Sequence, residues 1–443
     1  MRSAARAAIA ALALIAAAGP AAAAAPVTLA DVVAMAGGKS PAVQVADLKT
    51  DEAHSRWVQA RGPLLPGLTG SASMINHNFS LKALGITFAN VPGAPSQPNL
   101  VGPFDVVDAR LRATQTLLDL SSLKHLHAAG DGEKVADAER DQTAEGAAQT
   151  AALAYLRAAR AHAAADARRA DLGIASELLT LAQDQRRAGV SPGIDVTRAE
   201  TQVVSARSQL VVAENLLERA RIDLARALGI DPALRLELAD TLGAGLGASQ
   251  APEDSGAALA LAHQRRPELI AERMRLQRAR TERSAIAAER LPRLDAAADV
   301  GLSNDTWDGA PTTRSVGLAL TLPILDGLRR EGRLDEQRAA IDEAEVRGRD
   351  LEHQVAADVR GALLDLGSGL ELRQEAVDRL RLAEEELAQA RERFSSGVAN
   401  NIEVINAQSS LVRARDADIE ARYVIAAARV NLAHAAGVCQ TVH

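Results

Sequence analysis

Aromatic side chains are scarce in this sequence. They make up 2% of its 443 residues, although 47% of the residues are apolar and much of that share is alanine. Alanine favours helices and buries little area per residue, so this composition suits long, closely packed helices better than a thick globular core. The length is compatible with two or three domains or with one large repetitive architecture.

Cysteine is equally rare, because Cys439 is the only one and cannot form an internal disulfide. The sequence also lacks a nucleophile elbow, an HExxH motif, a phosphate-binding loop and a cysteine–histidine cluster. His125 and His127 stand two residues apart, which on a helix directs them to different faces, so we expect a solvated pair and not a metal site. We therefore expect no catalytic residue, no metal and no cofactor.

Positive charge is not in excess either. The net charge is −7 and the isoelectric point is near 5.8, which argues against a nucleic-acid partner. After the N-terminal segment, no uninterrupted apolar run approaches the roughly 18 residues that a membrane-spanning helix needs.

The N-terminal segment has the pattern of a secretory signal peptide. Arg2 and Arg6 precede the apolar run Ala7–Ala18, and small residues follow as far as Pro26. The apolar run is too short to span a bilayer, so residues 1–25 are interpreted as a signal peptide that is removed on export. No cysteine lies near the cleavage site, and we expect the protein not to be lipidated.

One short stretch occurs twice. Residues 188–202 read AGVSPGIDVTRAETQ, and 208 positions later the chain reads SGVANNIEVINAQSS; over 189–230 the two copies share 15 of 42 residues. Upstream, SPAV at 40–43 corresponds to RPEL at 266–269, and LLPGL at 64–68 to RLPRL at 290–294. We infer two long repeats, 26–240 and 241–443.

Each repeat is predicted to contain the same parts. A helix, about 29–60 or 257–289, ends at a Leu-Pro step, and a β-hairpin follows at about 66–116 or 293–323. Very long helices are expected at about 120–187 and 326–395, and final helices at about 194–228 and 402–436, ending at Gly229 and Gly437. The repeated stretch is thus the corner of a long helical hairpin.

The strands and long helices carry their own periodicities. In the second hairpin, apolar and polar residues alternate, which is typical of a strand with one lipid-facing side. We assign that side to Val316, Leu318, Leu320 and Leu322. In the first hairpin, residues 75–103 are interpreted as a long loop. On the second long helix, coiled-coil spacing of seven residues relates Leu363, Leu370 and Val377, and again Leu380, Leu387 and Phe394.

Taken together, these features resemble the TolC family of outer-membrane efflux proteins. The resemblance runs from VTLADVVAMA at 27–36 to LAHAAG at 432–437, and LPILDGLRREGRLDEQ at 322–337 and the two corners are its most specific pieces. It implies a mainly α fold with a small β part, in which a homotrimer shares one periplasmic α-barrel and one twelve-stranded outer-membrane β-barrel. Four strands from one chain cannot close a sheet in lipid, which agrees with a shared barrel.

The resemblance also implies roles for the two corners. Both would lie at the periplasmic tip, and the docking site of a periplasmic adaptor (membrane fusion) protein would comprise Gly189, Val190, Gly397 and Val398. Glu403, Asn406 and Asp195 would belong to the periplasmic aperture. Tightly closing family members carry an arginine two residues after the second glycine, where this sequence has Ala399. For Glu403 and Asp195, a simple helix-dipole role is the competing interpretation.

The expected function is that of an outer-membrane channel-tunnel. It would act as a passive exit duct that receives substrates from an inner-membrane exporter, of the proton-driven kind, through the adaptor. One alternative is the outer-membrane component of a type I protein secretion system. A second is a periplasmic coiled-coil adaptor without a pore, which explains the helices but not the four strands.

Overall fold

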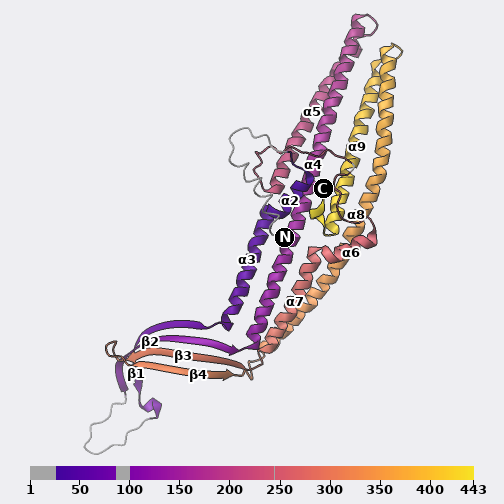
Figure 1. The fold of residues 1–443 in the computed structure, drawn as a ribbon. Coiled ribbons are helices and arrows are strands. Elements are labelled where there is room, and N and C mark those ends of the chain that lie inside the picture. Colours follow the sequence, from indigo (N-terminus) through magenta and orange to yellow (C-terminus); the bar gives the residue numbers. More distant parts are fainter. Residues whose placement is uncertain (1–25, 86–99, 244) are drawn as a thin grey trace, which may run out of the picture. The chain divides into compact units, whose positions relative to one another are not determined.

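The computed structural model describes residues 26–443 except 86–99 and 244 (Figure 1). The predicted signal peptide therefore lies outside the described residues. The helices are α2 Leu29–Lys39, α3 Pro41–Arg61, α4 Leu120–Arg187, α5 Gly193–Leu228, α6 Ser255–Arg265, α7 Pro267–Ala288, α8 Arg329–Ser395 and α9 Asn401–Ala435. The strands are β1 Gly67–Ser80, β2 Leu100–Leu118, β3 Arg293–Asn304 and β4 Thr312–Thr321. Short 3-10 turns occupy Gly62–Leu64, Lys82–Leu84 and Cys439–Thr441.

The chain forms two compact units. Among the described residues, the helical unit lies within 26–49, 137–271 and 348–443, and the sheet unit lies within 50–136 and 272–347. Each unit draws residues from both halves of the sequence, so this division differs from the two sequence repeats. The order of elements, two short helices, two strands and two longer helices, is the same in each half. The two-repeat organisation stays an interpretation of the sequence pattern.

The first helix of each half is broken, which differs from our prediction of single helices at 29–60 and 257–289. The break falls at Ser40 between α2 and α3, and at Arg266 between α6 and α7; both residues precede a proline and have extended backbone. The proline ring excludes the preceding residue from the helical region, which explains both breaks. The predicted Leu-Pro ends are close to the observed ends of α3 and α7.

One buried core of the helical unit joins α2, α4, α5, α9 and the C-terminus. Its largest side chain, Tyr155 on α4, is fully buried, and its hydroxyl donates to Val27 O at 2.9 Å. The same hydroxyl lies 3.0 Å from a carboxylate oxygen of Asp240. Leu29, Val32 and Leu224 are also completely buried here. The capping box of Thr28 and Asp31 starts α2 and fixes the entry of the chain into this core.

The two coiled-coil seams predicted on α8 differ in their burial. Leu387 and Phe394 are buried against the other helices near the corners, and Leu380 packs beside them. Leu370 and Val377, by contrast, are exposed in the single chain. Leu363, the first residue of this other seam, is partly buried and packs on two further clusters. Within one chain, the seam nearer the corners is therefore covered more completely.

The sheet unit contains one antiparallel sheet in the order β1-β2-β3-β4. The loop predicted for residues 75–103 is shorter, because β1 and β2 pair as far as Ser80 and Leu100; residues 86–99 lie outside the described part. Pairing along β1 overrides the local turn signals there. No helix in the described part of the chain combines the length and the apolar character that a membrane crossing requires.

Candidate functional site

The two corners belong to the helical unit and lie at the same end of it in Figure 1, between α4 and α5 and between α8 and α9. Gly189 and Gly397 have φ of +76° and +73°, a backbone conformation that favours glycine. In both corners the next valine donates its N–H to a carbonyl one turn back in the preceding helix, at 3.0 Å. Val190 and Val398 are 75% and 71% exposed. Both corners thus present an apolar side chain to the outside.

Asp195 braces the first corner and joins it to the second. Its carboxylate is buried, accepts a hydrogen bond from Ser191 Oγ at 2.8 Å and lies 3.5 Å from Arg198 Nη1. Its backbone carbonyl accepts from the buried amide of Asn401 at 2.7 Å. The side chain is therefore committed to contacts within the corner.

Glu403 has a different environment at the second corner. It is exposed, and its carboxylate oxygens lie 3.1 and 3.5 Å from Nε and Nη2 of Arg393, at the end of α8. Asn406, one turn further along α9, is exposed. Ala399, at the position of the family's arginine, donates its N–H to Arg393 O at 3.2 Å. Within one chain, Arg393 is the basic partner of Glu403.

The Arg393–Glu403 pair was not identified from the sequence. The two residues are ten apart and face each other only because the hairpin turns at Gly397. A second contact missed in the same way is the side chain of Gln185, which donates to Phe394 O at 3.0 Å and links α4 to α8. No short-range pattern signals either contact.

The sheet has one apolar and one polar face, as the alternation predicted. Cross-strand register places Leu68, Ala113, Ala298 and Val316 in one row on the same face. Leu68, Val316, Leu318 and Leu320 of this face are at least 68% exposed, whereas Leu322 lies just beyond the end of β4. Exposed aliphatic side chains in a continuous row form a surface that water solvates poorly.

The opposite face of the sheet carries charged side chains that neutralise one another. Arg110 of β2 donates to Asp108 at 2.8 Å and to Asp299 of β3 at 2.5 Å. Asp299 also accepts a hydrogen bond from Ser315 of β4. The two faces of the sheet therefore differ strongly in polarity.

His125 is not the solvated residue that we predicted. It lies between the carboxylates of Glu282 and Glu289, which the spacing of His125 and His127 could not reveal. Among the described residues, no group of three or more potential ligands could hold a metal ion.

The same fold occurs in solved outer-membrane channels. The outer-membrane channel OprN superposes with a TM-score of 0.76 at 20% identity, covering 93% of this chain and 90% of OprN. The CmeC outer membrane channel of Campylobacter jejuni gives 0.77 at 17% identity, covering 93% and 86%. The open state of the MtrE outer membrane channel of Neisseria gonorrhoeae gives 0.74 at 20% identity, covering 93% and 89%. The fold is therefore that of an outer-membrane channel subunit.

The sequence itself identifies the family. Residues 32–230 and 258–438 match the model of the family described as outer membrane efflux protein, and the chain belongs to that family. The family comprises outer-membrane channels and not enzymes, and membership places this chain in the outer membrane. A curated relative, Protein CyaE of Bordetella pertussis, is 28% identical over 284 residues. This match spans 63% of the present chain and 58% of the relative, less than two thirds of its length.

Proposed function

We propose that this chain forms, as a homotrimer, the outer-membrane exit duct of a tripartite efflux system. In this proposal an inner-membrane exporter, energised by protons, delivers substrates through a periplasmic adaptor. The observation that carries the proposal is the sheet, which has an exposed apolar face, a charged opposite face and edges that are unpaired among the described residues. Family membership and the long helical hairpins support it.

The strands have the dimensions that a membrane crossing requires. A tilted strand needs roughly 9–11 residues to cross the hydrocarbon layer. β3 and β4 have 12 and 10 residues, and β1 and β2 are longer. The exposed row that includes Leu68 and Val316 would face lipid, and Arg110 and Asp299 would face a water-filled interior.

The sheet edges require further copies of the chain. Among the described residues, β1 and β4 each pair on one side only. In lipid, unpaired backbone groups cost several kcal/mol each, so these edges must find partners. Because four antiparallel strands are an even number, β4 of one copy can continue the antiparallel order with β1 of the next. Three copies would close a ring of twelve strands.

The corners would form the periplasmic entrance. We assign the aperture to Glu403 and Asn406, which are exposed beside the second corner, and give Asp195 the role of a buried brace for the same aperture. The adaptor would dock on the exposed valines beside Gly189 and Gly397. Replacing either glycine by a bulky residue should impair adaptor-dependent export; normal export by both variants would remove this docking assignment.

Export of the chain itself would use the segment 1–25. We expect the mature protein to begin near residues 24–27 without an acyl group, because the segment has a signal-peptide pattern and no nearby cysteine. Intact mass of the protein from membranes measures both features. A retained leader or an added lipid would contradict this part of the proposal.

Two matched arginine substitutions test the sheet. Leu318→Arg places a charge on the apolar face, where it should cost roughly 2–4 kcal/mol near the centre of the bilayer and reduce insertion. Ala319→Arg, one residue along β4, places the same charge on the polar face opposite Asp295 and should insert normally. The measurement is the yield of heat-modifiable oligomer in outer-membrane fractions. Equal yields of the two variants would show that the faces of β4 are assigned wrongly.

We favour efflux over type I protein secretion as the function, because the matching family is one of efflux proteins. Deletion of the gene tests this preference: it should raise sensitivity to small toxic compounds and leave the set of secreted proteins unchanged. Loss of one secreted protein with unchanged sensitivity would favour secretion. The second alternative, a periplasmic adaptor without a pore, does not explain why one face of the sheet is apolar and exposed.

A further inference from the structure

Three helices meet beside the sheet in the sheet unit. α4 begins two residues after β2 ends, α7 ends five residues before β3 begins, and α8 begins eight residues after β4 ends. Because β2, β3 and β4 are neighbours in the sheet, these helix ends connect to adjacent strands. Contacts among the three helices therefore determine how the helical segments join the sheet.

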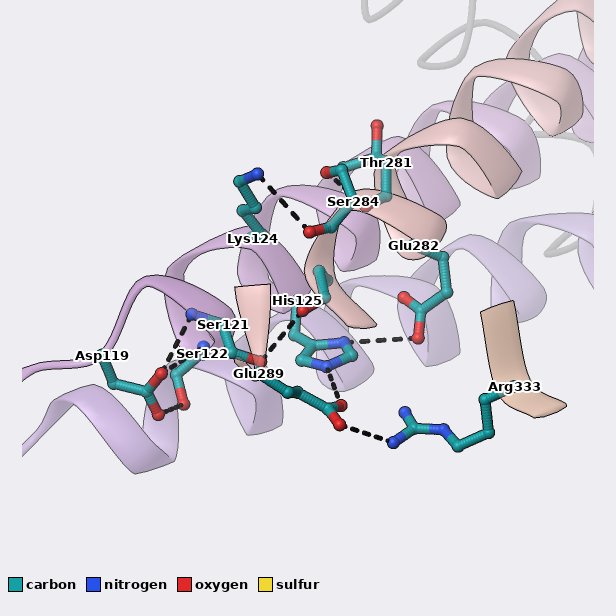
Figure 2. Close-up of polar contacts among 11 residues, drawn as sticks. Asp119, Ser121, Ser122, Lys124, His125, Thr281, Glu282, Ser284, Glu289 and Arg333 are labelled. Atoms are coloured by element: carbon teal, nitrogen blue, oxygen red, sulfur yellow. Dashed lines mark hydrogen bonds and ion pairs between the residues drawn. The ribbon is translucent and has the colours of Figure 1, made fainter. Parts of the chain in front are cut away.

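His125 of α4 occupies the centre of this junction, as Figure 2 shows. Its Nδ1 lies 3.3 Å from Oε1 of Glu282 on α7, and its Nε2 lies 3.6 Å from Oε1 of Glu289, in the turn after α7. The other oxygen of Glu289 accepts a hydrogen bond from Arg333 of α8 at 2.8 Å. One chain of charged groups thus runs from α4 through the end of α7 to α8.

The geometry suits an imidazolium, which carries a proton on both ring nitrogens. An ionised carboxylate only accepts hydrogen bonds, and a neutral imidazole donates from one nitrogen only. The imidazolium form alone can therefore donate toward both glutamates. A metal ion does not fit, because the two carboxylates lie at opposite nitrogens of the ring and do not converge on a common point. We propose that His125 is a proton-binding site that ties α4 to α7 and, through Glu289 and Arg333, to α8.

The charged surroundings favour the bound proton. The hydrogen bond with Glu282 raises the pKa of His125, burial opposes this rise, and Glu289 adds to it. The same hydrogen bond lowers the pKa of Glu282, and Arg278 and Arg333 lower it further. On α4 itself, the Lys124 ammonium is directed to Ser284 O at 3.4 Å. The two carboxylates beside the ring thus hold the pKa of His125 above its ordinary value.

Other contacts hold the junction when the proton leaves. Ser121 Oγ donates to Ala285 O at 3.2 Å, and Asp119 accepts from the backbone of Ser121 and Ser122 at the start of α4 (Figure 2). Loss of the proton should therefore loosen the end of α7 without unfolding the unit. The link is complete below the ordinary pKa of 6.5 and is lost as the pH rises through the raised pKa of His125.

Hydrogen exchange of the full-length protein in lipid nanodiscs tests the site. The readout is the protection factor of amides at 282–292, corrected for the intrinsic rate, at pH 6 and pH 8.5. In the wild type, protection should fall about fivefold at the higher pH. His125→Gln cannot carry the charge and should show the lower protection at both pH values. His125→Arg is always charged and should keep the higher protection at both. His127→Gln, on another face of the same helix, is the matched control and should behave as the wild type.

The outcomes are distinct from those of the channel proposal, because local protection is measured without transport. An unchanged pH response in His125→Gln would overturn the proton site. So would an alkaline loss of protection in His125→Arg equal to that of the wild type. If His125→Gln fails to fold, the test rests on the other two variants: His125→Arg should keep its protection at pH 8.5, and His127→Gln should lose it as the wild type does. Glu289→Gln weakens the link to α8 and should reduce the pH response; an undiminished response would contradict the path through Arg333.

Discussion

At the scale of single residues, the charges of the second corner offer the most direct test of the proposed entrance. Glu403 and Arg393 form an exposed ion pair within one hairpin, and an exposed pair adds little stability. In the proposed trimer, threefold symmetry would bring three copies of the pair to one opening, and their combined charge would act on passing ions. The selectivity of the pore should therefore respond to either partner while the trimer stays intact.

We expect Glu403→Gln to lower cation selectivity by about twofold and Arg393→Gln to raise it, because each changes the local potential in the opposite sense. Planar-bilayer reversal potentials measure both. Glu385→Gln removes the same charge further back on α8, beside Arg381, and should change nothing. If Glu403→Gln matches Glu385→Gln, Glu403 has only a helix-terminal role.

A second residue, Glu145, makes part of the helical unit sensitive to pH. Its carboxylate is buried and accepts a hydrogen bond from Cys439 N at 3.1 Å, while its other oxygen has no hydrogen-bond partner among the described residues. Burial raises its pKa to about 7. Because the folded state holds the proton more tightly, the stabilisation is complete below pH 4.5 and is lost as the pH rises through 7.

We expect the free energy of opening of the C-terminal turn 437–443 to fall by up to about 3 kcal/mol between pH 4.5 and pH 8. Glu145→Gln should remove this dependence and protect the turn better than the wild type above pH 7. Hydrogen exchange of these amides measures the effect. A wild-type profile that is flat, or that rises with pH, would show that Glu145 does not keep its proton in the folded state.

At the scale of elements, the glycine that follows the last helix of each half packs against the helix break at the start of the same half. Gly229, after α5, packs on Pro41, and Gly437, after α9, packs on the backbone at Arg266. Both have positive φ. A Cβ at Gly229 would overlap Pro41 Cδ, and one at Gly437 would come within 2.7 Å of Arg266 N. The residue pairs are far apart in sequence but play the same part in each half.

Gly229→Ala and Gly437→Ala should each lower stability by about 2–4 kcal/mol, since strain in φ adds to a steric clash. Gly397→Ala has a similar φ but open space around it and should cost about 1 kcal/mol. Thermal unfolding of the purified variants gives the ranking. Equal losses at all three positions would mean that φ alone matters and that the contacts with Pro41 and Arg266 do not.

At the scale of the whole molecule, the outer edges of β1 and β4, which have no partner among the described residues, predict how copies assemble. Each test variant carries two new cysteines, one at Ser71 or Ser73 of β1 and one at Thr313 or Ser315 of β4. The β4 cysteine of one copy should cross-link to the β1 cysteine of the next. The products should end at three chains, because three copies close the ring. A cysteine pair confined to β2 and β3 should give no product between chains. Native mass of any number other than three would contradict the trimer.

Much of the secondary structure was predictable because it depends on local causes. The long helix α4 was predicted at 120–187 and observed there, and α5 and α9 end beside the predicted glycines. The alternation of β3 and β4 determined which residues share a face, since strand geometry makes that a property of neighbours in sequence. The errors at Ser40 and Arg266 were also local, because the residue before a proline avoids the helical region.

The sequence by itself determined the elements, the corners and the class of protein, since periodicity, turn residues and family pattern are written along the chain. Tertiary structure alone decided which of these polar groups meet. Arg393 reaches Glu403, Asn401 reaches Asp195, and His125 lies between Glu282 and Glu289. These contacts join residues that are distant along the chain or meet only across a turn. The physical reason is that an ion pair depends on distance in space, and only the packing of one helix against another sets that distance.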